Sequence, residues 1–226
     1  MSRIHPARTS ANAGFTLIEM LVVFGIIIIV TSIVISSQGS FNKTILLANT
    51  AYDVALSIRH AETYGLGSRV INVSPNVGYG IDISRASPDA FILFADSYPV
   101  PSTSSICHPT VDVSAPDAKP GNCAYEPLQS ETITKYTLGN GVTISDFCAK
   151  TSGTWSCATS NGLGLVSLDI VFSRPNPTPL MSTNGNYSSI FPVTNACISL
   201  TSRSGGTRFI SVSSSGQISP TAASCP

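Results

Sequence analysis

The strongest constraint on this chain of 226 residues is one uninterrupted apolar run near its N-terminus. The run extends over 21 residues, from Phe15 to Ile35, and contains a single charged residue, Glu19. As an α-helix, a run of this length is about 32 Å long at ~1.5 Å per residue, which matches a membrane hydrocarbon core of ~30 Å. The run therefore predicts a membrane-spanning helix, with Gly25 as its most pliable position.

The residues on either side of the run predict its orientation and raise two ordinary explanations. Arg3, His5 and Arg8 precede it, and basic residues before a membrane helix favour a cytoplasmic N-terminus, with the rest of the chain outside. One explanation is a cleaved secretory signal, cut after the run, where residues 36–40 form only a mediocre small-residue site. The other is a plain signal anchor. Neither accounts for Glu19, because a carboxylate in a membrane helix is costly and usually marks function.

Residues 14–21, Gly-Phe-Thr-Leu-Ile-Glu-Met-Leu, resemble the prepilin motif of type IV pilins and type II secretion pseudopilins. The resemblance covers the leader and the whole membrane helix. It implies that a prepilin peptidase cuts after Gly14, that the new N-terminus at Phe15 is N-methylated, and that Glu19 acts in filament assembly. Glycine before the scissile bond suits this chemistry, because it lets a peptidase approach the backbone closely.

The same resemblance gives Glu19 a partner. Cleavage creates an α-ammonium group at Phe15, and a neighbouring subunit's Glu19 is expected to lie close to it. In a low-dielectric filament core each charge would be costly alone and tolerable when paired. We therefore expect the pair to set the axial register of subunits more than to add stability.

The composition indicates an extracytoplasmic, β-rich body. Charged residues make up only 11% of the chain, and the formal net charge is zero. Removing residues 1–14 takes away two arginines and leaves 10 basic against 12 acidic residues, so the mature chain has no global attraction for nucleic acid.

The cysteines all lie in the second half of the chain: Cys107, Cys123, Cys148, Cys157, Cys197 and Cys225. There is no C-x-x-C pair and the three histidines are scattered, so we expect no metal site, and no cofactor is predicted. An even count in a polar region favours disulfides over six buried free thiols. Of the fifteen connectivities that six cysteines allow, sequential pairing is the simplest: Cys107–Cys123, Cys148–Cys157 and Cys197–Cys225. The last pair resembles the disulfide-bounded loop of many pilins.

The periodicity predicts an α+β fold in which a long N-terminal helix packs on an antiparallel β-sheet body, and the resemblance to pilins implies the same, pilin-like plan. We expect a leader at 1–14, a membrane and filament-core helix at 15–37, an amphipathic helix at 38–66 and a β-rich extracytoplasmic body at 67–226. The amphipathic helix shows an apolar stripe with a 4, 3, 4, 3 spacing, which is typical of a core-facing helix. The stripe consists of Leu47, Ala51, Val54, Ile58 and Ala61. Residues 36–40 are poor helix formers, so a bend or fraying is expected there.

Alternating patterns after residue 67 predict the strands of the body. They are expected at 70–74, 79–84, 91–95, 131–137, 142–147, 164–172, 196–201 and 207–213. Asn-Gly pairs at 140–141, 161–162 and 184–185 indicate turns, and Gly205-Gly206 predicts a hairpin between the last two strands. Residues 97–130 and 173–195 are expected to be long loops.

We expect a structural subunit of a type IV pilus or type II secretion pseudopilus, held in the inner membrane with a cytoplasmic N-terminus before assembly. Its implied partners are the prepilin peptidase/methylase, other pilin or pseudopilin subunits and the inner-membrane assembly platform. Residues 55–63 and 209–218 more faintly resemble H-class minor pseudopilins and FimT-like pilins.

Two other functions remain open at this point. A minor pilin could bind DNA or a surface weakly, since Arg174, Arg203 and Arg208 follow the last acidic residue, but three arginines are few for phosphate binding. A membrane-anchored enzyme is the remote alternative. The chain has no Walker loop, no G-x-S-x-G and no H-E-x-x-H, so we expect it not to be an enzyme.

Overall fold

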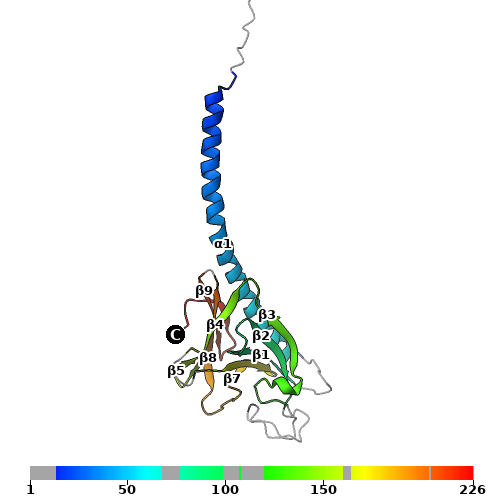
Figure 1. The fold of residues 1–226 in the computed structure, drawn as a ribbon. Helices are drawn as coiled ribbons and strands as arrows, with labels where there is room; N and C mark the ends of the chain where they lie inside the picture. Colours follow the sequence, from blue (N-terminus) through cyan, green and yellow to red (C-terminus); the bar gives the residue numbers. More distant parts are fainter. Residues whose placement is uncertain are drawn as a thin grey trace, which may run out of the picture. The chain divides into compact units, whose positions relative to one another are not determined.

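The apolar run and the segment after it belong to one helix, α1, Leu17–Leu66. The computed structural model describes residues 14–67, 77–98, 107, 120–159, 164–203 and 205–225, apart from the side chains of 37–43. The helix assignment is continuous through 36–40, where we expected a bend or fraying. Two compact units divide the chain, Met1–Asn42 and Lys43–Pro226. Figure 1 shows the strands of the second unit, most of them labelled.

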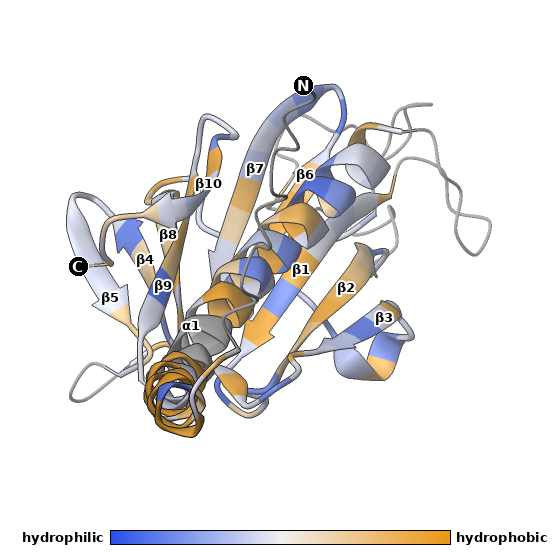
Figure 2. Ribbon diagram, turned by 90° about the horizontal axis from the view of Figure 1, so that it is seen from above, coloured by the Kyte–Doolittle hydropathy of each residue, from blue (hydrophilic) through white to orange (hydrophobic). Residues whose placement is uncertain are grey.

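Within the second unit, α1 contributes the predicted apolar stripe to the core. All five residues of the stripe are buried, and Ile58 and Ala61 have no exposed surface. They pack with inward-facing residues of both β-sheets in one cluster, and Figure 2 shows this part of α1 lying across β1. The helix ends close to a strand: a Cβ on Gly65 would collide with the backbone carbonyl of Phe172, so only glycine allows this approach.

The first sheet has the order β3-β2-β1-β6-β7, and all its pairings are antiparallel. Its strands are β1 Gly78–Ser84, β2 Ala90–Asp96, β3 Thr132–Thr137, β6 Ser167–Ser173 and β7 Asn176–Thr183. In β1, Ile81 and Ile83 point to the main core, so Asp82 between them points to the opposite face. We call that opposite face the outer face of the first sheet.

The second sheet has the order β10-β9-β8-β4-β5 and is also antiparallel. Its strands are β4 Val142–Thr151, β5 Thr154–Cys157, β8 Val193–Ser202, β9 Thr207–Ser213 and β10 Ile218–Ala222. The predicted hairpin between β8 and β9 is confirmed, and Gly205 and Gly206 adopt φ values of +83° and +95°. The two sheets and α1 enclose the main core, which confirms the α+β, pilin-like fold class.

The outer face of the first sheet is covered by residues 120–131, which we call the cover segment. The segment contains the short 3-10 helix η1, Pro127–Gln129. Cys123, joined to Cys107, packs there on Phe94 and Val171 in a second small core. This cover turns outward-pointing residues of β1, β2 and β6 into buried ones.

Three of the observed strands were not predicted, and one predicted loop is wrong in part. β5, β7 and β10 were not expected, and β7 together with the start of β8 lies inside the predicted loop 173–195. β7 contains two prolines, which argue against a central strand; the strand is at the edge of its sheet, where a missing N–H donor is tolerated. The predicted strand at 70–74, the turn at 161–162 and most of the predicted loop 97–130 lie outside the described residues.

Candidate functional site at the N-terminus

The peptide bond after Gly14 is exposed and precedes the helix. Residues 14–16 are non-helical and exposed, and α1 begins at Leu17. A Cβ placed on Gly14 would meet nothing within 4 Å, so glycine is not required here by the packing of the described chain. The packing of the described residues therefore leaves the backbone at Gly14 accessible, as the predicted peptidase cleavage requires.

Thr16 and Glu19 form the start of the helix. Thr16 is the N-cap, since its Oγ1 accepts a hydrogen bond from the backbone N–H of Glu19 at 3.3 Å. The order Thr-x-x-Glu is that of a capping box. The negative charge of the glutamate also interacts favourably with the positive N-terminal end of the helix dipole. Sequence reasoning overlooked Thr16, although the T-x-x-E spacing before an apolar run was visible.

Glu19 itself is exposed and carries the only charge of the first turn. Among the described residues the one ion pair joins Arg59 and Glu62 at 3.1 Å, so Glu19 has no cationic partner within the described chain. A carboxylate on an apolar helix without such a partner has to be solvated at the membrane interface or paired with a group of another molecule.

The helix after Glu19 is built for an apolar environment. Leu17–Ser36 has a mean hydropathy of 2.9 and is long enough to cross a membrane. Figure 2 shows this part of α1 as almost uniformly hydrophobic. Its hydroxyls are satisfied internally, because Thr31 Oγ1 donates to the Ile27 carbonyl at 2.6 Å and Ser32 Oγ to the Ile28 carbonyl at 2.8 Å. The segment is therefore consistent with a membrane anchor.

The six cysteines form three disulfides in the structure: Cys107–Cys123, Cys148–Cys157 and Cys197–Cys225. These are the sequential pairs. Cys107–Cys123 holds the cover segment, and Cys148–Cys157 links the hairpin strands β4 and β5 at facing positions. Cys197–Cys225 attaches the residues after β10 to β8.

The buried carboxylates of the body were not anticipated from the sequence. Asp96 and Glu131 are 0% and 2% exposed. Asp96 accepts two backbone N–H groups of the cover segment, and Glu131 accepts one from that segment and two from the residues just after β2. Burial, together with the side chain of Glu126, raises the pKa of Glu131 to about 7. Burial, and then the charge of Glu131, raise the pKa of Asp96 well above its usual value.

The three arginines considered for DNA binding do not form one group. Arg203 and Arg208 are exposed at the end of the β8–β9 hairpin, in the second sheet. Arg174 is half-buried at the turn between β6 and β7, in the first sheet. Its backbone N–H donates to the Gly65 carbonyl at 3.3 Å, so this residue also helps to hold the end of α1.

An exposed N-terminal glycine motif, an apolar helix and an α+β body are the parts of a pilin-like subunit. Residues 9–35 match the family model of the prokaryotic N-terminal methylation motif. No curated protein and no solved structure gives a significant match. The chain therefore carries the N-terminal motif of the type IV pilin and pseudopilin family. This family points to a structural subunit rather than an enzyme, and the resemblance to H-class and FimT-like proteins stays a prediction.

Proposed function

We propose that this chain is a prepilin that is cleaved after Gly14, N-methylated at Phe15 and assembled through its N-terminal helix into a type IV pilus or type II secretion pseudopilus. The observation that carries the proposal is the position of the methylation motif on the structure. The motif ends within the apolar helix, and its glycine lies in the exposed residues just before that helix.

Cleavage before the apolar run, instead of after it, leaves an apolar helix on the mature protein that can pack against other helices. Large apolar side chains such as Phe24, Ile29 and Ile33 are 59%, 62% and 66% exposed, and water disfavours that surface. A membrane shields it first, and helices of neighbouring subunits shield it in the filament. The same surface thus supports both storage in the inner membrane and assembly.

The orientation and partners follow from the same proposal. The leader is cytoplasmic, where the prepilin peptidase/methylase acts on it, and the body is extracytoplasmic, where disulfides form. The inner-membrane assembly platform then adds the subunit to other pilin or pseudopilin subunits. The domain limits proposed are 1–14 for the leader, 15–37 and 38–66 for the two parts of the helix and 67–226 for the body.

Mass spectrometry of the protein purified from membranes tests the processing step. The wild-type chain should begin at methylated Phe15, and Gly14→Val should retain the fourteen-residue leader, because a branched side chain blocks the approach of the peptidase. Gly25→Ala is the matched control: a Cβ there meets nothing within 4 Å, so cleavage should be normal. An N-terminus within 37–40 would show an ordinary secretory signal and would refute the filament proposal.

A further inference from the structure

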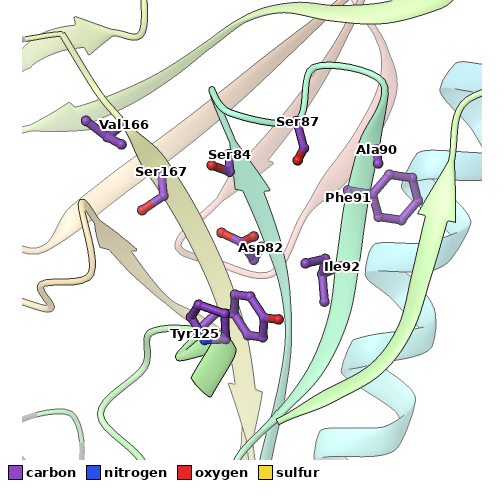
Figure 3. A pocket seen from close by; sticks show the side chains of 10 residues that line it. Asp82, Ser84, Ser87, Ala90, Phe91, Ile92, Tyr125, Val166 and Ser167 are labelled. Atoms are coloured by element: carbon purple, nitrogen blue, oxygen red, sulfur yellow. The ribbon is translucent and has the colours of Figure 1, made fainter. Parts of the chain in front are cut away.

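A second candidate site lies on the outer face of the first sheet, beside the cover segment. It is a pocket of about 370 Å³ with Asp82 of β1 on its floor. Figure 3 shows Asp82 at the centre of the lining side chains, with Ser84 and Ser167 on one side and Tyr125 on the other. Ile92, Pro127 and Val166 supply apolar lining. The pocket thus combines one acidic floor, hydroxyl groups and apolar walls.

Asp82 is half of a buried acidic pair. It is 5% exposed and faces Asp169 of β6, which is 1% exposed, in the register of the two strands. Asp169 is held by the cover segment and by β7, because it accepts hydrogen bonds from the backbone N–H of Tyr125 and from the Ser182 hydroxyl. Its other oxygen, Oδ1, is buried without a hydrogen-bond partner among the described residues.

The pair has no counter-ion within the described part of the chain. The one ion pair found there lies on α1, between Arg59 and Glu62. Burial raises the pKa of Asp82 to about 6 and, with the charge of Asp82, raises the pKa of Asp169 well above its usual value. Asp82 supplies the one carboxyl group among the described residues that line the pocket, so the pocket offers a single negative charge, which suits a monovalent cation. Burying that charge without a partner is costly, so the pocket is electrostatically incomplete.

We infer that this pocket binds a primary alkylammonium group, the chemistry of a lysine side chain, with the ammonium on Asp82 and the methylene chain against the apolar walls. The inference goes beyond the proposed filament function. An ammonium has three donors, which the Asp82 carboxylate and the Ser84 and Ser167 hydroxyls can accept. The ring of Tyr125 adds a π face beside the charge, and the apolar walls suit an alkyl stem.

A bare divalent ion fits this pocket less well. Calcium takes six to eight oxygen ligands at about 2.3–2.6 Å, often from several carboxylates, whereas the described lining of the pocket supplies one carboxyl group, that of Asp82. The volume lies in the range of about 300–1,000 Å³ that accommodates small organic ligands. An alkylammonium ligand uses both the single charge and the space.

Nuclear magnetic resonance of the full chain in detergent micelles tests the inference. Titration with n-butylammonium at neutral pH should give saturable shifts at Asp82, Ser84 and Tyr125, while neutral 1-butanol should leave these signals unshifted. Nα-acetyl-lysine amide should produce the same shifts if the natural source is a protein side chain; shifts with n-butylammonium alone assign the site to a free amine. Equal shifts with 1-butanol, or saturation by calcium at lower concentration, would overturn the inference.

Three variants make the test specific. Asp82→Asn should weaken n-butylammonium binding at least tenfold, and Asp53→Asn, an exposed carboxylate on α1, should leave it unchanged. Because Asp82→Asn also alters a buried pair, Val166→Trp provides a second route: Val166 is 57% exposed at the pocket, so a larger ring should obstruct entry without disturbing the core. Unchanged affinity in either folded pocket variant, with folding checked by near-ultraviolet circular dichroism, contradicts the proposed site.

Discussion

Glu19 combines two physical roles that a substitution can separate. In the precursor its backbone N–H is capped by Thr16, and its side chain stands where a capping box places a glutamate or a glutamine. In the proposed filament its charge pairs with the α-ammonium of a neighbour's Phe15. A cap of this kind stabilises a helix by about 1 kcal/mol whichever of the two side chains is present. Only the second role requires the charge.

We therefore expect Glu19→Gln and Glu19→Val to be inserted and cleaved normally but to be lost from filaments. Glutamine keeps the capping chemistry and removes the charge, so failure of both variants assigns the role to the ion pair. Filament incorporation is measured by immunoblot of sheared filaments, or by surface display if the subunit is a minor one. Thr31→Val is the control, since its hydroxyl is satisfied within the helix. Normal assembly of both Glu19 variants would refute the register argument and leave the processing assignment intact.

At the scale of elements, regular patterns were predictable and context-dependent ones were not. The apolar stripe of α1 and the alternation of β1, β2, β8 and β9 depend on neighbours in the sequence, and they are observed as expected. β5 follows a tight turn at Ser152 and Gly153, both with positive φ, and Ser-Gly is a weaker turn signal than Asn-Gly. β7 is defined by its edge position, which only the assembled sheet reveals.

The burial of acidic residues such as Asp82 could also not be predicted from the sequence. The alternation in β1 places Asp82 opposite the core, and such a position normally faces solvent. It is buried because the cover segment, about forty residues further along the chain, crosses the outer face and is held there by Cys123 and Asp96. At the N-terminus the reverse applies: Gly14, Phe15 and Glu19 belong to a local motif, so the candidate site could be proposed from a short stretch of sequence.

The disulfides give a prediction for the second sheet. Cys148 faces Cys157 on one side and Cys197 on the other in strand register, so register alone allows either bridge. Non-reducing peptide mapping should recover Cys148 linked to Cys157, and a Cys148–Cys197 peptide would contradict the structure. In the chain-entropy model, sequence separations of 9 and 28 correspond to about 2.6 and about 3.6 kcal/mol. Replacing both partners by serine should thus destabilise the body less for Cys148–Cys157 than for Cys197–Cys225, by urea denaturation.

For the molecule as a whole, the buried acids determine how stability changes with pH. Asp82 and Glu131 have pKa values of about 6 and about 7 in the folded state, against ordinary values of 3.8 and 4.5. Asp82 faces Asp169, and Glu131 faces Asp96 and Glu126. These neighbours are all acidic, so none of them lowers the raised pKa values by a positive charge. Between pH 4 and 7 the folded chain holds protons that the unfolded chain has released. Stability must therefore fall as pH rises through this window.

We expect the full chain in detergent to unfold at a lower temperature at pH 7.5 than at pH 5, followed by the fluorescence of Trp155. The loss should be on the order of 3 kcal/mol, because each pKa unit corresponds to about 1.4 kcal/mol and the two groups act in the same direction. Asp82→Asn should reduce the slope, since the amide stays neutral at both pH values, whereas Asp53→Asn, exposed on α1, should keep it. A melting temperature that rises from pH 5 to 7.5 would show that these carboxyl groups are ionised in the folded body and matched by cations.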